Sequence, residues 1–324
     1  MNQDQIKQLN EAVEAVKTRK IENVYFVACG GSKAIFDPAQ FIFDRETTLP
    51  SFVYNANEFI HRCPKGLGEN SLVVTCSHSG NTLETTRATQ LAGDKGALTI
   101  SLSYRVDSPL WKATQHPISY VWGPESNPGD NNNGMLYRLV FSILNVLQPN
   151  EKYERAIKAC DNLGKVYEAN KAKFAESAKA FGKKYKNNKL IYTMSSGPCY
   201  GVAYSFAICL LQEMQWIHSG TIHTGEFFHG PFEVTDANTP FVIQVSEGST
   251  RELDERCLKF LHTYAKRIEV LDAKELGLSV IDPAVVDYFN HSLFNNVYPI
   301  YNHALAETRQ HPLTTRRYMW KVAY

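Results

Sequence analysis

The chain has 324 residues, of which 44 % are hydrophobic and 21 % are charged, and its formal net charge is +1. This length predicts roughly two domains with a large buried core. The near-neutral charge argues against a general nucleic-acid binder. No apolar run is long enough to cross a membrane, so we expect neither nucleic acid nor membrane as a partner.

The seven cysteines are scattered along the chain and form no CxxC pair. An odd number without a regular spacing indicates free thiols in a reducing compartment, not a disulfide framework. The N-terminal segment also lacks the apolar core of a signal peptide. We therefore expect a cytoplasmic protein.

Short apolar strands alternate with helical segments along the whole chain, which is typical of parallel sheets with right-handed crossovers. The pattern occurs twice. VYFVACGGS in the first half corresponds to IYTMSSGPC in the second, and LVVTCSHSGNT corresponds to FVIQVSEGST. We therefore predict an α/β protein with two tandem αβα sandwich domains and parallel sheets. The expected strands are 23–28, 51–54, 71–76, 97–102, 118–122, 189–194, 240–245 and 267–271, with 221–223 as a possible short one.

The domain limits follow from this duplication. We predict a first domain over 1–150, a helical linker over 151–188 and a second domain over 189–324. The linker is rich in lysine, with a possible apolar helical face at Val166, Phe174, Ala178 and Phe181. A lysine-rich helix is usually a solvated face, and the alternative is a positive field that steers an anionic substrate.

Two loops of the first half carry the small and hydroxyl residues that suit an anion. ACGGS follows the strand 23–28, and SHSGNT follows the strand 71–76. Each loop opens a helix, whose unpaired N–H groups attract anions. The simpler alternative is that the Ser and Thr side chains only cap these helices. The chain has no GxxxxGK[ST] motif and no GxGxxG after its first strand, so ATP and NAD are disfavoured and no cofactor is expected.

The segment YSFAICLLQEMQWIHSGTIHTGEFFHGPFEV contains the candidate acid–base residues. Residues 204–217 are expected to form a buried helix with Glu213 as its one charged residue. Burial would raise the pKa of such a carboxylate and suit it to act as a general base. A structural glutamate with a partner is the alternative. His229 follows in a tight HGP turn, and the spacing of His218, His223 and His229 matches no standard metal site.

At these residues the chain resembles the SIS (sugar isomerase) family. ACGGS resembles a CGTS loop of the family, SHSGNT resembles SQSGET, and GEFFHGP resembles GExxHGP. The resemblance covers both halves and implies two SIS-type αβα sandwiches that bind a phosphosugar. Gly31, His78 and Asn81 depart from the family pattern. The resemblance implicates Ser32, Ser77, Ser79 and Thr82 in phosphate binding, and Gly31, His78 and Asn81 in the same loops are further candidates for substrate binding.

The C-terminal segment YPIYNHALAETRQHPLTTRRYMWKVAY is similar to bacterial deglycases that act on phosphorylated Amadori compounds, with fructoselysine or fructose-aspartate adducts as substrates. This resemblance implies release of glucose 6-phosphate and a free amino acid, by a homodimer with active sites at the subunit interface. Glu213 would be the base and His229 the acid. Such chemistry needs neither a metal nor another cofactor.

Arg316 and Arg317 occupy roughly the place of an active-site lysine in the related synthases. Arginine forms no Schiff base but binds a carboxylate or a phosphate, which favours aspartate over lysine as the amino-acid part of the substrate. A surface arginine pair is the alternative. The polar loop 123–133 either lines the sugar or is a plain flexible loop.

Three other functions stay open at this point. The same acid–base pair would serve an aldose–ketose isomerase of phosphosugars. An amine-transferring synthase would need an ammonia source. A phosphosugar sensor without catalysis would also use such a loop, although sensors of this family that regulate transcription carry a helix-turn-helix module, for which we find no segment.

Overall fold

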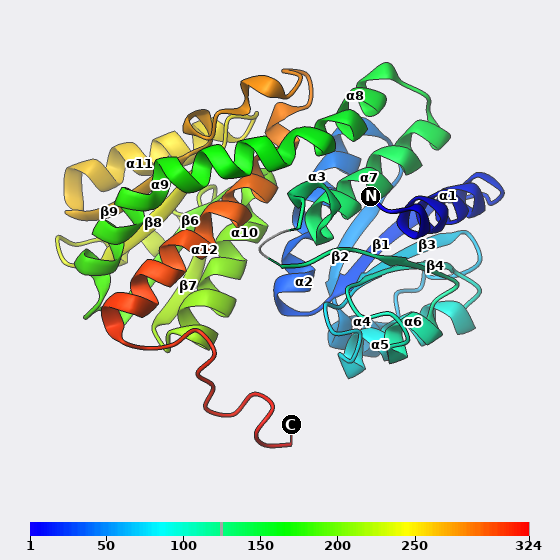
Figure 1. Ribbon diagram of the computed structural model, residues 1–324, viewed down its shortest axis with the longest axis horizontal. Helices are drawn as coiled ribbons and strands as arrows, with labels where there is room; N and C mark the ends of the chain where they lie inside the picture. Colours follow the sequence, from blue (N-terminus) through cyan, green and yellow to red (C-terminus); the bar gives the residue numbers. More distant parts are fainter. Residues whose placement is uncertain (124–125, 324) are drawn as a thin grey trace. The chain divides into compact units, whose positions relative to one another are not determined.

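The computed structural model describes residues 1–123 and 126–323 and divides the chain into two compact units, residues 1–164 and 165–324 (Figure 1). The division falls in helix α9 (Leu163–Tyr185), inside the segment predicted as a linker. The limits 1–150, 151–188 and 189–324 stay a prediction. The expected apolar face of this segment is buried, namely Val166, Phe174, Ala178 and Phe181. None of the helices in the described part of the chain has the length and apolarity that a membrane span requires.

The first unit contains a five-stranded parallel sheet with the order β2-β1-β3-β4-β5. The limits of the first four strands lie within one residue of the prediction, and the fifth begins two residues earlier and ends three residues earlier than predicted. Their bounds are β1 Asn23–Ala28, β2 Ser51–Asn55, β3 Ser71–Cys76, β4 Leu98–Ser103 and β5 His116–Ser119.

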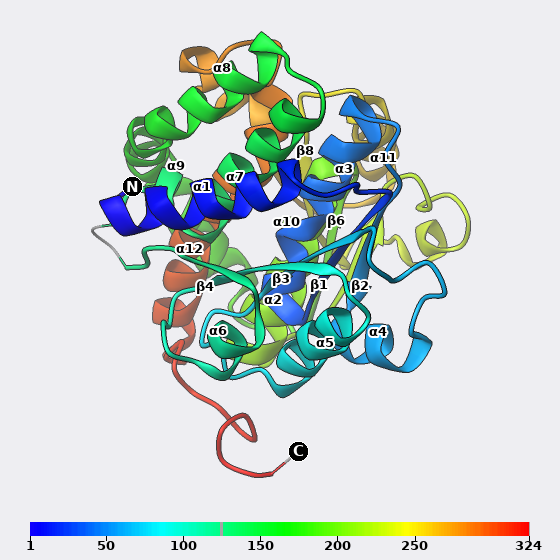
Figure 2. The same ribbon diagram turned by 90° about the vertical axis from the view of Figure 1, so that its right-hand side faces the viewer.

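Helices cover both faces of this sheet (Figure 2). One face carries α4 (Ala56–Arg62), α5 (Leu83–Asp94) and α6 (Pro109–Ala113), and the other carries α1, α3 and α7. Every residue of β3 and β4 is buried as a result. β3 carries an apolar run at its centre, whereas β4 alternates apolar residues with the small hydroxyl residues Thr99, Ser101 and Ser103, all of them buried. The remaining helices are α1 Gln3–Lys17, α2 Gly30–Ala34, α3 Phe36–Glu46, α7 Asn132–Leu147 and α8 Glu151–Ala159.

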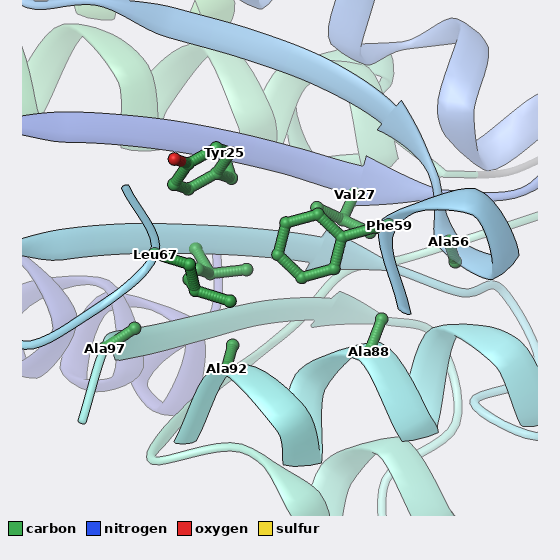
Figure 3. Close-up of a cluster of buried hydrophobic side chains, with 9 residues drawn as sticks. Tyr25, Val27, Ala56, Phe59, Leu67, Ala88, Ala92 and Ala97 are labelled. Atoms are coloured by element: carbon green, nitrogen blue, oxygen red, sulfur yellow. The ribbon is translucent and has the colours of Figure 1, made fainter. Parts of the chain in front are cut away.

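Small alanine side chains allow α5 to pack closely on the sheet. Ala88 and Ala92 of α5 face Tyr25 and Val27 of β1 in one apolar cluster, to which Phe59 of α4 adds its ring (Figure 3). Because this packing holds α5 against the sheet, it restricts the position of the loop that precedes the helix.

The second unit repeats the topology with four parallel strands in the order β7-β6-β8-β9. The possible short strand 221–223 is a full strand that begins at His218. The elements are β6 Leu190–Ser195, α10 Tyr200–Ser205, β7 His218–His223, β8 Pro240–Val245, α11 Arg251–Tyr264, β9 Arg267–Asp272 and α12 Asn290–Arg309. The α/β architecture with parallel sheets is thus confirmed.

The predicted buried helix over 204–217 differs from the observed structure. Helix α10 continues at Phe206 as a π-helix, labelled η4, which ends at Met214. Ile208 and Leu210 are only half-buried, and Trp216 is exposed with a left-handed φ of 54°. A π-helix widens each turn by about one residue, so an apolar pattern read at the α-helical period assigns the wrong buried face. This geometry is frequent at functional sites.

Candidate active site

The strand order of the first unit creates a switch point between β1 and β3. The chain passes from β1 to β2 on one side and then crosses to β3 on the other, and Ala28 pairs with Cys76 at the ends of the two strands. Open parallel sheets bind ligands at such a point, outside the carboxyl ends of the strands. The ACGGS and SHSGNT loops both begin there, so the structure places the two predicted loops side by side.

Hydroxyl groups organise the SHSGNT loop from within. Ser77 Oγ and Thr82 Oγ1 are 2.9 Å apart, and the Gly80 N–H donates to Ser77 Oγ at 3.1 Å. The Asn81 N–H donates to Ser79 Oγ at 3.2 Å. Thr82 occupies the N-cap position of α5, but its side chain makes no capping hydrogen bond. The first N–H groups of α5 therefore keep their capacity to bind an anion, which favours the anion site over simple capping.

Gly80 is required by the shape of this loop. Its φ is +64°, and a Cβ atom there would collide with the side chain of Ser108. Only glycine combines a left-handed backbone with such a close approach. The loop can therefore bring its backbone N–H groups toward a ligand without a side chain in the way.

The ACGGS loop opens the short helix α2 and contains Gly31 and Ser32, both half-buried. Burial raises the pKa of the Cys76 thiol to about 12, and the Ser32 side chain opposes this rise to a smaller extent. This thiol stays protonated at neutral pH, so it is not a nucleophile.

His78 lies within an aromatic cluster that the sequence did not lead us to expect. Its ring stacks on Tyr104 at 5.0 Å, meets the edge of Trp122 at 5.0 Å, and its Nδ1 is 3.0 Å from the hydroxyl of Tyr120. Burial of the ring lowers the pKa of His78, with a smaller contribution from the positive charge of Arg105. The imidazole is thus neutral at pH 7 and can act as a hydrogen-bond donor. The missed signal was the aromatic residues that directly follow the observed strands, Tyr104 after β4 and Tyr120 after β5.

In the second unit Glu213 lies on the π-helix and has a partner. Its Oε1 is 2.7 Å from Nη2 of Arg316, and the two side chains are 23 % and 9 % exposed. The expectation of a lone carboxylate on a buried helix is therefore wrong, since an arginine distant in sequence neutralises it. The sequence did not reveal this pair, because the two residues lie on separate elements.

The turn 224–230 presents His229 to solvent. Phe227 anchors the turn in the core, where its ring meets Phe228 and Phe260 edge-on. Gly230 has a φ of +122°, and the His229 N–H donates to the Glu226 carbonyl at 2.9 Å. This fixed turn can orient the imidazole. Among the described residues, no hydrogen bond joins His229 to Glu213 and no group of three potential ligands could hold a metal ion.

Arg317 has a different environment from Arg316. Its guanidinium lies 4.2 Å above the ring of Trp216, and the residue is exposed. The two arginines thus have separate partners and do not form one clamp. In the polar loop 123–133, residues 124 and 125 lie outside the described residues, and the later part is held by Arg138, whose Nε donates to the Gly129 carbonyl at 3.0 Å.

The switch point of the second unit is filled by the chain itself. Between β6 and β8, the carboxylate of Asp254 accepts hydrogen bonds from Ser196 Oγ at 2.8 Å, Thr224 Oγ1 at 2.7 Å and the Ser246 N–H at 3.1 Å. Burial raises the pKa of Asp254 to about 6, although these donors favour its charged form. Donors that would suit a bound anion are thus already occupied.

Known proteins are similar to this chain in sequence and in fold. A model of the SIS domain matches residues 17–147. The fructosamine deglycase FrlB of Bacillus subtilis is 48 % identical over 319 residues, covering 98 % of this chain and 97 % of the relative. The fructoselysine 6-phosphate deglycase of Escherichia coli K12 is 28 % identical over 273 residues, covering 82 % of this chain and 77 % of the relative.

The same likeness extends to three dimensions. The crystal structure of a Bacillus subtilis protein described as a candidate phosphosugar isomerase superposes with a TM-score of 0.97 at 48 % identity, covering 98 % of this chain and 97 % of that one. The parallel sheets, the switch-point loop and the matching domain define a protein of the SIS class. Within this class, the chain belongs to the family of the fructosamine deglycases.

Proposed function

We propose that this protein is a deglycase that cleaves a 6-phosphofructosyl amino acid with water to glucose 6-phosphate and a free amino acid. The full-length likeness to a fructosamine deglycase carries the proposal. The fructoselysine 6-phosphate deglycase of Escherichia coli supports a phosphorylated substrate, and the hydroxyl-lined loop at the first switch point supports recognition of its phosphate.

The reaction needs one base and one acid. In the open chain, a base removes a proton from C1, beside the C2 carbonyl, and the electrons form an enaminol. A proton returned to C2 converts the enaminol into an imine at C1. Water adds to this imine, and the C–N bond breaks as the amine leaves with a proton. Atoms and electrons balance without a redox cofactor.

Glu213 is proposed as the base and His229 as the acid that opens the ring and moves a proton at the sugar oxygen. The role of Glu213 is supported by its second carboxylate oxygen, Oε2, because the ion pair with Arg316 involves Oε1. The role of His229 is supported by its exposure to solvent and by the fixed turn on which it lies. Each group would contribute about 10²–10⁴-fold to the rate.

The phosphate is proposed to bind at the SHSGNT loop through Ser77, Ser79 and Thr82, with Ser32 and the Gly31 backbone from the neighbouring loop. Asn81, and His78 as a neutral donor, would contact the sugar side of the substrate. Support comes from the uncapped N-terminus of α5, since helix N–H groups and hydroxyls bind phosphate without a metal.

The amino-acid part of the substrate is proposed to be aspartate in preference to lysine. Arg317 supports an acidic amino acid in the substrate, because its exposed guanidinium can bind a carboxylate. Arg316 supports it less, because its Nη2 already binds Glu213. A panel of aspartate, asparagine and lysine adducts tests this preference by kcat/KM, and equal values for the aspartate and lysine adducts would contradict it.

We also propose a homodimer with the active site at the subunit interface. The exposure of His229 in the single chain supports it, since a proton-transfer site normally excludes bulk water. Sedimentation of the pure protein tests the assembly. A monomer with full activity would contradict the proposal.

The purified protein given 6-phosphofructosyl amino acids should release glucose 6-phosphate, measured by a coupled assay. Glu213→Gln and His229→Ala should each lower kcat by about 10²–10⁴-fold with an unchanged circular dichroism spectrum. His218→Ala is the control, because His218 is exposed on β7 and should retain activity. No release from acidic, neutral or basic adducts would refute the function, and full activity of either variant would remove its assigned role.

Phosphosugar isomerisation is the second candidate, supported by the description of the Bacillus subtilis structure. It uses the same base at the same carbon. Fructose 6-phosphate incubated in deuterated water without an amine would exchange its C1 proton and yield glucose 6-phosphate if the protein is an isomerase. Binding of sugar phosphates without any turnover would instead indicate a sensor.

A further inference from the structure

The segment 311–321 packs against the end of the π-helix that carries Glu213. The ring of His311 meets that of Trp216 edge-on at 4.7 Å, and Nε2 of Gln215 donates to the His311 carbonyl at 3.0 Å. The left-handed φ of Trp216 ends the helix and turns its side chain out of the core, to where Arg317 covers it at 4.2 Å. The C-terminal segment is therefore attached next to Glu213 by three separate contacts.

Arg316 is fixed in this segment by its own neighbours. Its Nη1 donates to the carbonyls of Leu313 at 2.7 Å and Thr315 at 2.9 Å, and its guanidinium lies 5.4 Å from the ring centre of Trp320. Lys321 Nζ donates to the Arg316 carbonyl at 2.6 Å. A buried guanidinium held in this way has little rotamer freedom left to lose when it binds a carboxylate.

We infer that Arg316 is a positioning residue that holds Glu213 in its reactive rotamer. The inference rests on the proposed function. The ion pair engages Oε1 of Glu213, and Oε2 has no hydrogen-bond partner among residues 1–123 and 126–323. A glutamate side chain has three rotatable bonds, and an ion pair between one of its oxygens and a rigid guanidinium restricts the direction of the other oxygen. Oε2 is thereby the oxygen that accepts the proton.

Two other roles for Arg316 make different predictions. A residue that only binds the substrate would change KM and leave kcat intact. A residue that only anchors the C-terminal segment would change the melting temperature, and an added small ion would not restore activity. A positioning residue changes kcat, because misplacement of the base costs the chemical step.

The test compares Arg316→Ala and Arg316→Lys in the full-length protein with a 6-phosphofructosyl amino acid. We expect Arg316→Ala to lower kcat by about 10²-fold with KM within about threefold of the wild-type value. Guanidinium chloride in the tens of millimolar should restore part of the kcat of Arg316→Ala, and sodium chloride should not. Arg316→Lys has a single ammonium group in place of the planar guanidinium, so its kcat should lie between those of the wild type and Arg316→Ala.

Tyr318→Ala is the matched control in the same segment. Tyr318 is 64 % exposed, so the kcat of this variant should equal that of the wild type. A kcat of Arg316→Ala within twofold of wild type, a loss confined to KM, or a loss that guanidinium does not restore would each overturn the inference. Failure of the wild type to release glucose 6-phosphate overturns the proposed function itself and is seen before any variant is compared.

Discussion

At the scale of single residues, Thr82 of the SHSGNT loop does not make the hydrogen bond that is usual for threonine at the N-cap of a helix. Threonine at an N-cap normally accepts a hydrogen bond from the helix that it precedes. Thr82 faces Ser77 instead, at 2.9 Å, and α5 begins without a side-chain cap. The loop thereby keeps its own shape and leaves helix N–H groups to a ligand.

Gly80→Ala should destabilise the first unit and abolish phosphate binding. The left-handed φ and the collision with Ser108 together should cost about 3 kcal/mol of the free energy of unfolding. Urea denaturation followed by circular dichroism measures this loss. A variant as stable as the wild type would contradict the requirement for glycine.

Gly93→Ala is the matched control in the helix that this loop begins. Gly93 lies within α5 without a left-handed φ, and a Cβ atom added there would meet no atom within 4 Å. Alanine at this position should raise the free energy of unfolding by about 0.5–1 kcal/mol, because it lowers the conformational entropy of the unfolded chain. The opposite signs of the two substitutions separate backbone strain from a general intolerance of alanine.

At the scale of elements, the beginning of α12 contains a buried histidine that responds to pH. His291 is fully enclosed, and its Nδ1 lies 3.2 Å from the Pro198 carbonyl. Burial lowers the pKa of His291 from 6.5 to about 4. The ring is therefore a neutral donor to that carbonyl at physiological pH.

Acidification should destabilise the protein through this group. Between pH 6.5 and 4 the unfolded chain binds a proton that the folded chain does not, so the free energy of unfolding falls as the pH falls. From pH 7 to pH 5 the loss should be about 2 kcal/mol. The difference between the wild type and His291→Asn in urea denaturation at the two pH values measures it, because the raised pKa of Asp254 acts in the opposite direction over the same range in both proteins. His291→Asn keeps an N–H donor but does not titrate, and an equal loss in that variant would assign the effect to other groups.

At the scale of the whole molecule, one topology was used twice with different results. Both sheets place their second strand on one side of the first and the third strand on the other. The first switch point has an uncapped helix and a hydroxyl-lined loop, whereas the second is filled by Asp254. The fold thus has two switch points, and hydrogen-bond donors at the second already bind the carboxylate of Asp254.

Each chain should accordingly bind one phosphosugar. Titration calorimetry of Glu213→Gln with a 6-phosphofructosyl amino acid should give one site per chain. Ser79→Ala in the first loop should weaken binding about tenfold, as a hydrogen bond to a charged group is lost. Ser246→Ala in the corresponding loop of the second unit should leave affinity unchanged. Two sites per chain, or equal effects of the two serines, would contradict the single-site prediction.

Local sequence patterns were sufficient to predict most of the architecture. Apolar strands followed by small and hydroxyl residues predicted the parallel sheets, their limits and the position of the SHSGNT loop, because strand period and helix-start chemistry act over a few residues. The prediction for 204–217 failed because a π-helix has no local signature that differs from an apolar α-helix.

The sequence by itself determined the α/β class, the duplication and the candidate residues Glu213, His229 and Ser77. Only the tertiary structure decided their surroundings. It paired Arg316 with Glu213 from a separate element, stacked His78 among aromatic side chains, and closed the second switch point with Asp254. Charge pairing and burial arise between residues far apart in the chain, so no local pattern encodes them.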